Sequence, residues 1–345
     1  MKILVKYIIV LPLIGLFATG CNGNSEEDAG EMLAFDFISE KADEVHFAGT
    51  RASVLTTTAS LNSNGNTIGL YGSYDYGGAT SYKVFDAEPK QLTYDNSVSG
   101  VTYWTYSPKQ KWHREANYMF RAYYPMSDIV TKTSSAKLLV AEYRTTVDQY
   151  DFMVACTTRR PATDAEGVNK VQLTFRHALS GLRFKVKYKN TVTPATSFDH
   201  VTDMFLNNIY PVGTLLFGKE YDSDPVDRLQ WQMSYFSTYD RYYRWGGMKE
   251  FGVDGYGMTA NIYDDYNDDG VVFTIPQVLT NAKVNFKTSK GGDAVYTAEL
   301  KTSDVSEWLP GKIYTYTLTV AGSSIELTVS VEDWTDVASN VDIYI

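Results

Sequence analysis

The sequence predicts an all-β protein with two domains of similar size. Composition is the first observation: the 345 residues include 27 Tyr, 16 Phe and 6 Trp, and aromatic residues favour strands over helices. The second is a strict alternation of apolar and polar residues in several segments, which gives a strand one apolar and one polar face. Length is the third, because a domain holds roughly 100 to 200 residues.

The first 20 residues are predicted to be a signal peptide. Lys2 and Lys6 form a short positive region, residues 7–18 are apolar, and small residues precede Cys21. The apolar stretch is too short to span a bilayer. A Cys at this position resembles the processing site of bacterial lipoproteins, where the enzyme cuts before the Cys and its thiol is diacylated. The alternative is an ordinary secretory signal in which Cys21 has no role.

Residues 21–31 have no apolar periodicity and are predicted to form a flexible tether. The run from Ser25 to Asp28 resembles the acidic signal of surface-exposed lipoproteins; the alternative is a solvated linker. Without Lys2 and Lys6, the mature chain has 29 basic residues (31 minus 2) and 41 acidic ones, a net charge of −12. This charge excludes the basic footprint of a nucleic-acid binder, so the outer membrane is expected to be reached through lipid alone.

Two alternating segments occur in the middle of the chain. In the first, the apolar positions are Val171, Leu173 and Phe175; in the second they are Leu182, Phe184, Val186 and Tyr188, and basic residues lie between them. After Lys189, residues 190–197 are rich in Thr and Pro, which is typical of a linker. We therefore expect an N-terminal β-sandwich domain at residues 32–189 and a C-terminal one at residues 190–345.

The clearest hairpin is near the end of the chain. Tyr314, Tyr316, Leu318 and Val320 alternate with Thr, residues 321–324 supply a turn, and a second alternating strand starts at Ile325.

Sequence signatures of enzymes are missing: there is no Gly-x-Ser-x-Gly, His-Glu-x-x-His, phosphate-binding loop or Cys-x-x-Cys. We expect no enzyme and no cofactor, and an extracellular hydrolase is the least favoured function. Asp265, Asn267 and Asp269 match the first positions of a calcium loop, but Pro276 stands where the loop needs Glu. A β-turn is the favoured interpretation, and a metal site is not expected.

The segment from Trp231 to Gly247 is dense in aromatic residues. It offers a candidate ligand surface, because aromatic faces provide contact area for sugars or proteins; the candidate residues are Trp231, Tyr235, Tyr239, Tyr242 and Trp245. The alternative is that these side chains fill a core. The ligand-surface hypothesis leads to a second candidate function, a surface-exposed glycan-binding lipoprotein.

Several segments, in their order along the chain, resemble the fimbrillin family, the lipoprotein pilin subunits of type V pili. The segments run from about residue 32 to the C-terminus: Val45-His46-Phe47 with Thr50-Arg51-Ala52; Phe120 to Pro125; Tyr150 to Ala155; Leu173 to Ser180; Ile275-Pro276-Gln277; Trp308 to Tyr316; and Val331 to Trp334. The His-Ala-Leu sequence at residues 177–179, following Asp-Phe-Met-Val-Ala at residues 151–155, is the most specific part.

The resemblance implies two tandem transthyretin-like β-sandwich domains and assembly by strand exchange. A maturation protease would cut between Arg51 and Ala52, and loss of the strand at Met32–Gly49 would open a groove for the C-terminal strand of a neighbour. Other pilin subunits would be head-to-tail partners in a fimbrium that supports cell adhesion.

Carried onto this chain, the side chains of the donor strand would be Val331, Trp334, Val337, Val341, Ile343 and Ile345. Two alternatives stay open: Arg51 is an ordinary loop residue, and the terminal segment is the last strand of its own domain.

Overall fold

The structure is a computed structural model. It describes residues 34–36, 61–63, 65–95, 103–108, 110, 113, 115–127, 132–135, 138–145, 150–159, 170–188, 199–219, 221–237, 250–251, 260–261, 271–288, 291, 293–321, 324–334 and 337–338. The elements in these ranges are strands, and most of their pairings are antiparallel. The all-β prediction is confirmed.

The largest sheet, here called the N-terminal sheet, comes mainly from the first half of the chain. Its strands are β2 (Thr67–Asp75), β3 (Tyr82–Lys83), β4 (Lys90–Asp95), β5 (Tyr103–Thr105), β6 (Asn117–Tyr124), β9 (Met153–Arg159), β11 (Thr174–His177) and β25 (Val337–Ala338). They lie in the order β25-β11-β9-β6-β2-β4-β5, with β3 paired to β2. One face buries a core cluster that includes Ile68, Leu92, Trp104, Phe120 and Phe175.

A second sheet, the bridging sheet, combines strands from both halves of the sequence. It has the order β15-β14-β8-β7 and consists of β7 (Lys132–Ser135), β8 (Leu138–Arg144), β14 (Ile209–Gly218) and β15 (Leu229–Ser237). Leu139, Leu215 and Phe217 of this sheet pack with Tyr71 and Tyr123 from the other face of the N-terminal sheet. The two sheets therefore share a core although their strands are far apart in sequence.

Two further sheets face each other and form the C-terminal sandwich. One is β17-β12-β23-β24 with β18 paired to β12, and the other is β16-β13-β20-β21. Their bounds are β12 (Ser180–Tyr188), β13 (Asp199–Asn207), β16 (Glu250–Phe251), β17 (Ala260–Asn261), β18 (Val272–Thr274), β20 (Lys283–Thr288), β21 (Tyr296–Glu299), β23 (Lys312–Ala321) and β24 (Ser324–Asp333). A third core cluster, including Leu206, Val284 and Tyr316, fills the space between them.

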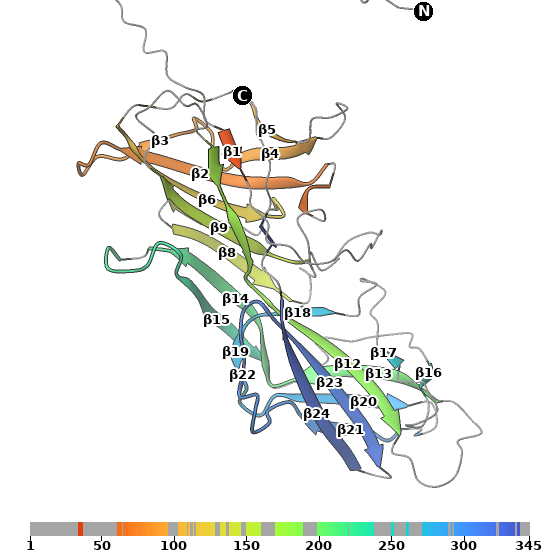
Figure 1. The fold of residues 1–345 in the computed structure, drawn as a ribbon. Coiled ribbons are helices and arrows are strands. Elements are labelled where there is room, and N and C mark those ends of the chain that lie inside the picture. The colour runs from red at the N-terminus through yellow and green to blue at the C-terminus, as the bar shows by residue number, and fades with distance from the viewer. Residues whose placement is uncertain are drawn as a thin grey trace, which may run out of the picture.

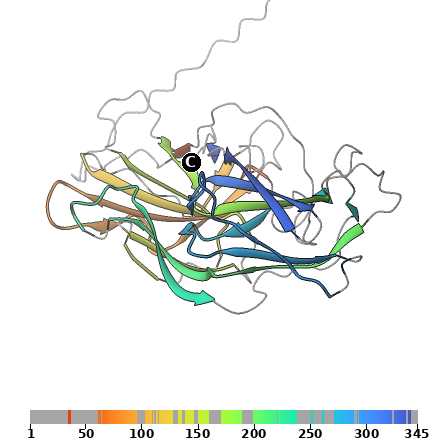
Figure 2. The ribbon, with the colours of Figure 1, turned by 90° about the horizontal axis from the view of Figure 1, so that it is seen from below.

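Two short pairs complete the described strands: β1 (Ala34–Asp36) with β10 (Lys170–Gln172), and β19 (Gln277–Val278) with β22 (Glu307–Trp308). The ribbon is elongated, with the N-terminal sheet in the upper half of Figure 1 and the C-terminal sandwich in the lower half. Seen from below, the strands lie in stacked layers (Figure 2).

The alternation in the sequence matches the observed burial. Leu182, Phe184 and Val186 of β12 are buried while Arg183 and Lys185 between them are half-buried. In β23, the predicted positions from Tyr314 to Val320 are buried in the same alternating way, and β24 pairs with β23 along its whole length. The predicted hairpin is therefore present.

β12 comes before the expected boundary after Lys189 and pairs with a strand near the end of the chain. It runs parallel to β23, with Leu182 opposite Tyr314, so this basic strand lies in the C-terminal sandwich. Ala178 and Leu179 connect β11 of the N-terminal sheet to β12. The domain boundary itself stays a prediction, because a pairing between strands more than a hundred residues apart is not evident from local composition.

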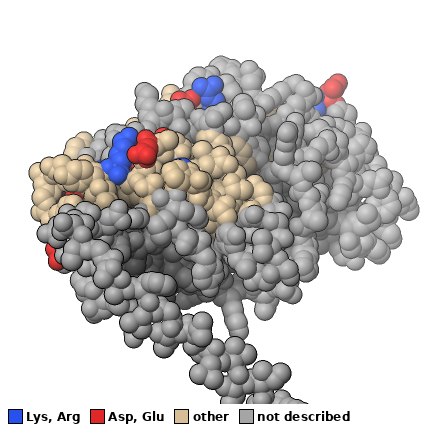
Figure 3. Space-filling model, turned by 90° about the horizontal axis from the view of Figure 1, so that it is seen from above, with Lys and Arg blue, Asp and Glu red and all other residues tan. Residues whose placement is uncertain are grey.

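No helix in the described part of the chain is long and apolar enough to cross a membrane. On the face seen from above, the described surface is mostly uncharged, and its few Lys or Arg side chains lie beside Asp or Glu (Figure 3).

Candidate functional site

Two short strands pair with consecutive strands of the chain. β1 pairs with β10 in parallel, with Phe35 opposite Val171, and forms a separate two-stranded sheet with it. β25 pairs with β11 in antiparallel orientation, with Val337 opposite Phe175, at the end of the N-terminal sheet. β9 pairs with β11 and also lies close to β10. We call residues 170–177, which pair with β1 and β25, the shared edge.

The ladders of both strands are short within the described residues. There, β1 has three paired residues and β25 has two, whereas β12 and β23 share nine pairs. A backbone ladder of two or three residues contributes little free energy, because each net hydrogen bond is worth roughly 1 kcal/mol. The described pairing at the shared edge is therefore weak.

Trp334 anchors the chain where it passes from β24 to β25. Its side chain is 3% exposed. The indole stacks on His177 with ring centroids 4.1 Å apart, and on Phe273 with centroids 5.4 Å apart. The backbone N–H of Trp334 donates a hydrogen bond of 2.8 Å to the carbonyl of Gly311. Trp334 is therefore a core residue of the junction between the N-terminal sheet and the C-terminal sandwich.

His177 packs against Trp334, and its own contacts hold it in place. Its Nδ1 lies 2.8 Å from Oδ1 of Asp151, and both side chains are buried. The adjacent Ala178 donates its backbone N–H to the carbonyl of Phe152 at 2.9 Å. The segments 151–155 and 177–179, which carried the most specific resemblance, thus meet and set the plane on which Trp334 packs.

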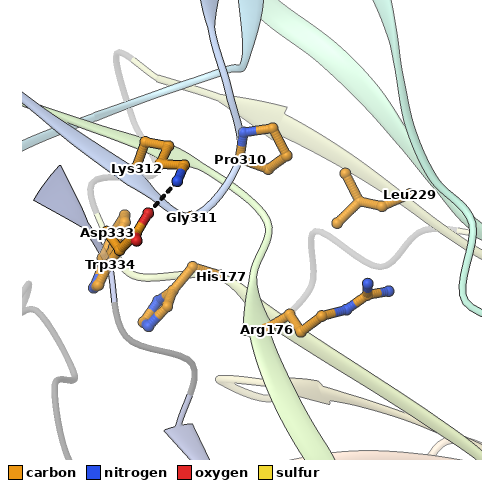
Figure 4. A pocket seen from close by; sticks show the side chains of 8 residues that line it. All are labelled: Arg176, His177, Leu229, Pro310, Gly311, Lys312, Asp333 and Trp334. Carbon is orange, nitrogen blue, oxygen red and sulfur yellow. Dashed lines mark hydrogen bonds and ion pairs between the residues drawn. The ribbon is translucent and has the colours of Figure 1, made fainter. Parts of the chain in front are cut away.

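A pocket of about 440 Å³ opens beside His177 and Trp334 (Figure 4). Its lining consists of Arg176, His177, Leu229, Pro310, Gly311, Lys312, Asp333 and Trp334. Lys312 pairs with Asp333, and this hydrogen bond raises the pKa of Lys312. Arg176 lies 3.5 Å from the carboxylate of Asp227 and donates to its backbone carbonyl at 2.6 Å. Both cations of the lining are therefore neutralised, and no lining residue is a Ser, Thr or Cys nucleophile.

Arg121 is a buried charge that the sequence did not reveal. Its side chain is 0% exposed, and no hydrogen-bond partner for its three guanidinium nitrogens is found in the described part of the chain. The guanidinium lies over the Phe217 ring, 5.2 Å from its centroid, and Cys156 is its neighbour across the ladder. Burial lowers the pKa of Arg121 and raises that of Cys156. Within the alternation of β6, Arg121 looks like an ordinary solvent-facing residue.

The predicted donor residues fall into two groups. Val331 is 48% exposed and lies in β24 opposite Tyr314, Trp334 is buried in the junction, and Val337 lies in β25. Val341, Ile343 and Ile345 lie outside the described residues. In this structure Val331 lies in a strand, and Trp334 in the core, of their own chain, and the donor assignment stays a prediction.

One residue of the predicted aromatic surface, Trp231, has a described side chain, and this side chain is packed. Trp231 is half-buried, its Nε1–H donates to the carbonyl of Ala178 at 2.9 Å, and its ring meets Tyr143 edge-on with centroids 6.4 Å apart. Tyr235 lies in β15 opposite Val212. Core packing is thus the better interpretation for Trp231.

The other predicted site residues lie outside the described residues: Cys21, Arg51, Ala52, Tyr239, Tyr242, Trp245, Asp265, Asn267 and Asp269. Within the ranges that the structure does describe, no group of three or more His, Cys, Asp or Glu side chains is placed to hold a metal ion.

Comparison with protein families decides the affiliation of the chain. The sequence pattern of the fimbrillin-like family matches residues 50–334. The chain belongs to the fimbrillin-like family. Among curated protein sequences, no match is found.

Two solved structures share the fold, and a third is more distant. A candidate cell adhesion protein from Bacteroides uniformis has a TM-score of 0.55 at 17% identity, over 90% of this chain and 100% of that one. A fimbrial protein from Bacteroides vulgatus has a TM-score of 0.53 at 17% identity, over 88% and 99% of the two chains. The tip fimbrial protein Mfa3 from Porphyromonas gingivalis, with a C-terminal truncation, has a TM-score of 0.39 at 13% identity, over 83% and 97%.

Membership of this family sets the class of function. Fimbrillin-like proteins are fimbrial proteins, which are structural and not enzymatic. The chain is accordingly not an enzyme, and the edge that carries β1 and β25 is its candidate assembly site.

Proposed function

We propose that the chain is a lipid-anchored structural or accessory subunit of a type V pilus, which polymerises by protease-triggered strand exchange and supports cell adhesion. The observation that supports this proposal is the shared edge: β1, near the N-terminus, pairs with β10, and β25, near the C-terminus, pairs with the next strand, β11.

The register of the two pairings makes the exchange specific. Ala338 lies opposite Thr174 in the antiparallel ladder. If a strand continued that ladder onto β10 in the same register, Val341 would stand opposite Val171, which is the partner of Phe35 in β1. A C-terminal segment and β1 therefore compete for one stretch of backbone, and loss of β1 leaves unpaired N–H and C=O groups that a second strand satisfies.

The donated segment starts after Trp334. Withdrawing the buried indole from between His177 and Phe273 would cost about 3 to 5 kcal/mol, the range for removing a buried Trp side chain. The pocket-filling residues of the donor are accordingly Val337, Val341, Ile343 and Ile345, and Val331 and Trp334 stay with their own chain. Because donor and acceptor are different surfaces, the contact is head-to-tail and gives a filament.

The remaining parts of the proposal place the subunit on the cell. Cys21 carries the lipid that holds the precursor at the outer membrane, residues 22–31 form the tether, and the maturation protease cuts between Arg51 and Ala52. The cut frees Met32–Gly49, which contains β1. The two transthyretin-like domains are divided at Ala178 and Leu179, so that β12 opens the second domain; this division is supported by its pairing with β23.

A protease experiment on the chain from Asn22 onward tests the proposal. Treatment with an Arg-specific protease is expected to give a new N-terminus at Ala52 by mass spectrometry and a ladder of oligomers on an unboiled gel. Arg51→Ala should remain uncut there and monomeric. Deletion of Asn340–Ile345 should be cut, stay folded by circular dichroism, and fail to form a ladder. A truncated chain that still assembles would refute the donor assignment.

A further inference from the structure

Four aromatic rings gather at the end of β2, where the chain turns toward β3, at the left-hand tip of the N-terminal sheet in Figure 1. Tyr74 is central. Its ring centroid lies 5.3 Å from that of Tyr82 and 4.6 Å from that of His113, and both pairs are stacked. Tyr76 meets Tyr74 edge-on at 6.0 Å. We call these four residues the tyrosine platform.

The outer rings of the platform are open to solvent. Tyr76 is 57% exposed and Tyr82 is 47% exposed, although Tyr82 stacks on Tyr74 and Tyr76 meets both rings edge-on. In the described part of the chain, neither hydroxyl makes a hydrogen bond with another residue. The two exposed rings lie 6.4 Å apart at an interplanar angle of 67°, so they form an aromatic corner.

The base of the platform is rigid. Tyr118 packs beneath Tyr74 with centroids 5.4 Å apart, and its hydroxyl accepts the backbone N–H of His113 at 2.7 Å. The carboxylate of Asp75 accepts the backbone N–H of Gly77 at 2.8 Å, and Gly77 has a φ of +84°, which few other residues adopt. The turn that carries Tyr76 is therefore fixed without any contact from its ring.

Tyr82 is held independently of Tyr76. It lies opposite Tyr74 in the β2–β3 ladder. The next residue, Lys83, lies 3.9 Å from the carboxylate of Glu88, which also accepts the backbone N–H of Gly72 at 3.0 Å. A prearranged surface of this kind loses little conformational entropy on binding.

We propose that the tyrosine platform is a binding site for neutral carbohydrate. The apolar C–H face of a pyranose ring can stack on one ring of the corner formed by Tyr76 and Tyr82 while its rim contacts the other ring, and the hydroxyls and the exposed imidazole of His113 offer hydrogen bonds to the sugar hydroxyls. Rigid aromatic rings provide such contact area at a low entropic cost.

The contacts that the platform offers are those of a neutral ligand. Lys83, in the same hairpin, lies 3.9 Å from the carboxylate of Glu88 and is already paired. A neutral sugar binds through ring contact and hydroxyl hydrogen bonds and needs no cationic partner. A quaternary ammonium ligand would need rings on several sides.

The site is separate from the strand-exchange edge. β6 and β9 lie between β2 and β11 in the N-terminal sheet. Carbohydrate binding therefore does not depend on the proposed polymerisation, and it is measurable on the uncut monomer. In a filament, many copies of a weak site would bind with raised avidity.

Titration calorimetry of the uncut chain from Asn22 onward tests the proposal. The probes are the β-1,4-linked glucose hexamer, an N-acetyllactosamine tetrasaccharide and the α-2,3-sialylated form of that tetrasaccharide. We expect at least one neutral probe to bind with a Kd below about 1 mM, a strength typical of a weak, shallow site. The sialylated probe should bind no more tightly than its neutral form, because the proposed contacts include no cationic side chain.

Variants identify the residues. The double variant Tyr76→Ala with Tyr82→Ala should weaken binding at least about tenfold, since aromatic contact area is lost, while Tyr76→Phe with Tyr82→Phe keeps the rings and should retain part of the affinity. The matched control is Tyr221→Ala, which removes a 63% exposed ring from the loop after β14 and should leave the affinity unchanged. All variants should show the wild-type protease-dependent ladder.

Three results would overturn the proposal. The first is no binding of either neutral probe at 10 mM sugar, a concentration of about ten times the weakest expected Kd. The second is unchanged affinity in the double Ala variant. The third is an equal loss in Tyr221→Ala. If the wild-type chain binds sugar but forms no ladder after protease treatment, the polymerisation mechanism is refuted and the carbohydrate site stands.

Discussion

Trp334→Ala separates a core role of this residue from a donor role. The indole is 3% exposed and has an aromatic ring on each face, His177 and Phe273. A buried Trp removes roughly 150 to 250 Å² from water, and at about 25 cal/mol per Å² this corresponds to about 4 to 6 kcal/mol. Because the unfolded chain already shields part of that area and Ala retains some of it, we expect a loss of about 3 to 5 kcal/mol.

The assay is urea denaturation of the uncut monomer, followed by far-ultraviolet circular dichroism so that the lost indole does not affect the signal. Val331→Ala is the matched control, because Val331 is three residues earlier and 48% exposed; its loss should stay below about 1 kcal/mol. If Trp334→Ala costs no more than this control and instead abolishes the ladder, Trp334 is a donor residue and our reasoning fails.

Two further perturbations test other buried groups. Arg121→Met replaces a buried guanidinium that lacks a hydrogen-bond partner in the described residues; we expect unchanged or higher stability in urea, by up to about 2 kcal/mol, and a comparable loss would show that Arg121 is satisfied in solution. Burial raises the pKa of Tyr106 to about 12. Between pH 10 and 12 the unfolded state ionises while the folded state keeps the proton, so stability falls as pH rises through this window. In Tyr106→Phe, the loss of unfolding free energy between pH 10 and 12 should be smaller by about 2 kcal/mol. An identical pH profile of the variant and the wild type would contradict the raised pKa of Tyr106.

Strand identity could be predicted from the sequence because it is local. The alternation at Leu182–Val186 and Tyr314–Val320 predicts which side chains face a core, and those side chains are buried in the structure. The turn after Ala321 could likewise be predicted from the residues next to it.

Partnership between strands could not be predicted in the same way. β12 pairs in parallel with β23, and β8 pairs with β14, across long separations that leave no local trace in composition. The expected boundary after Lys189 followed a Thr- and Pro-rich segment, but the long ladder between β12 and β23 decides where the sheets divide.

The surroundings of individual side chains are not evident from the sequence for a related reason. An aromatic residue in a dense segment, such as Trp231, looks the same in sequence whether it faces a ligand or the Ala178 carbonyl. Arg121 alternates as a surface residue would, but both faces of the N-terminal sheet are covered at that point, so its guanidinium is buried against Phe217. The tyrosine platform joins residues from β2, β3 and the segment before β6, which only the fold brings together.

The central claim is that β1 must leave β10 before another strand can enter. Phe35 and Val171 are partners in this ladder, and the spacing of paired Cα atoms in a sheet permits a disulfide. In the chain from Asn22 onward, Phe35→Cys and Val171→Cys on a Cys156→Ala background would tether β1 after the protease cut. Oxidised, cut protein should remain monomeric on an unboiled gel, and reduction should release a ladder. Oxidised protein that assembles as fast as the reduced form would contradict the account.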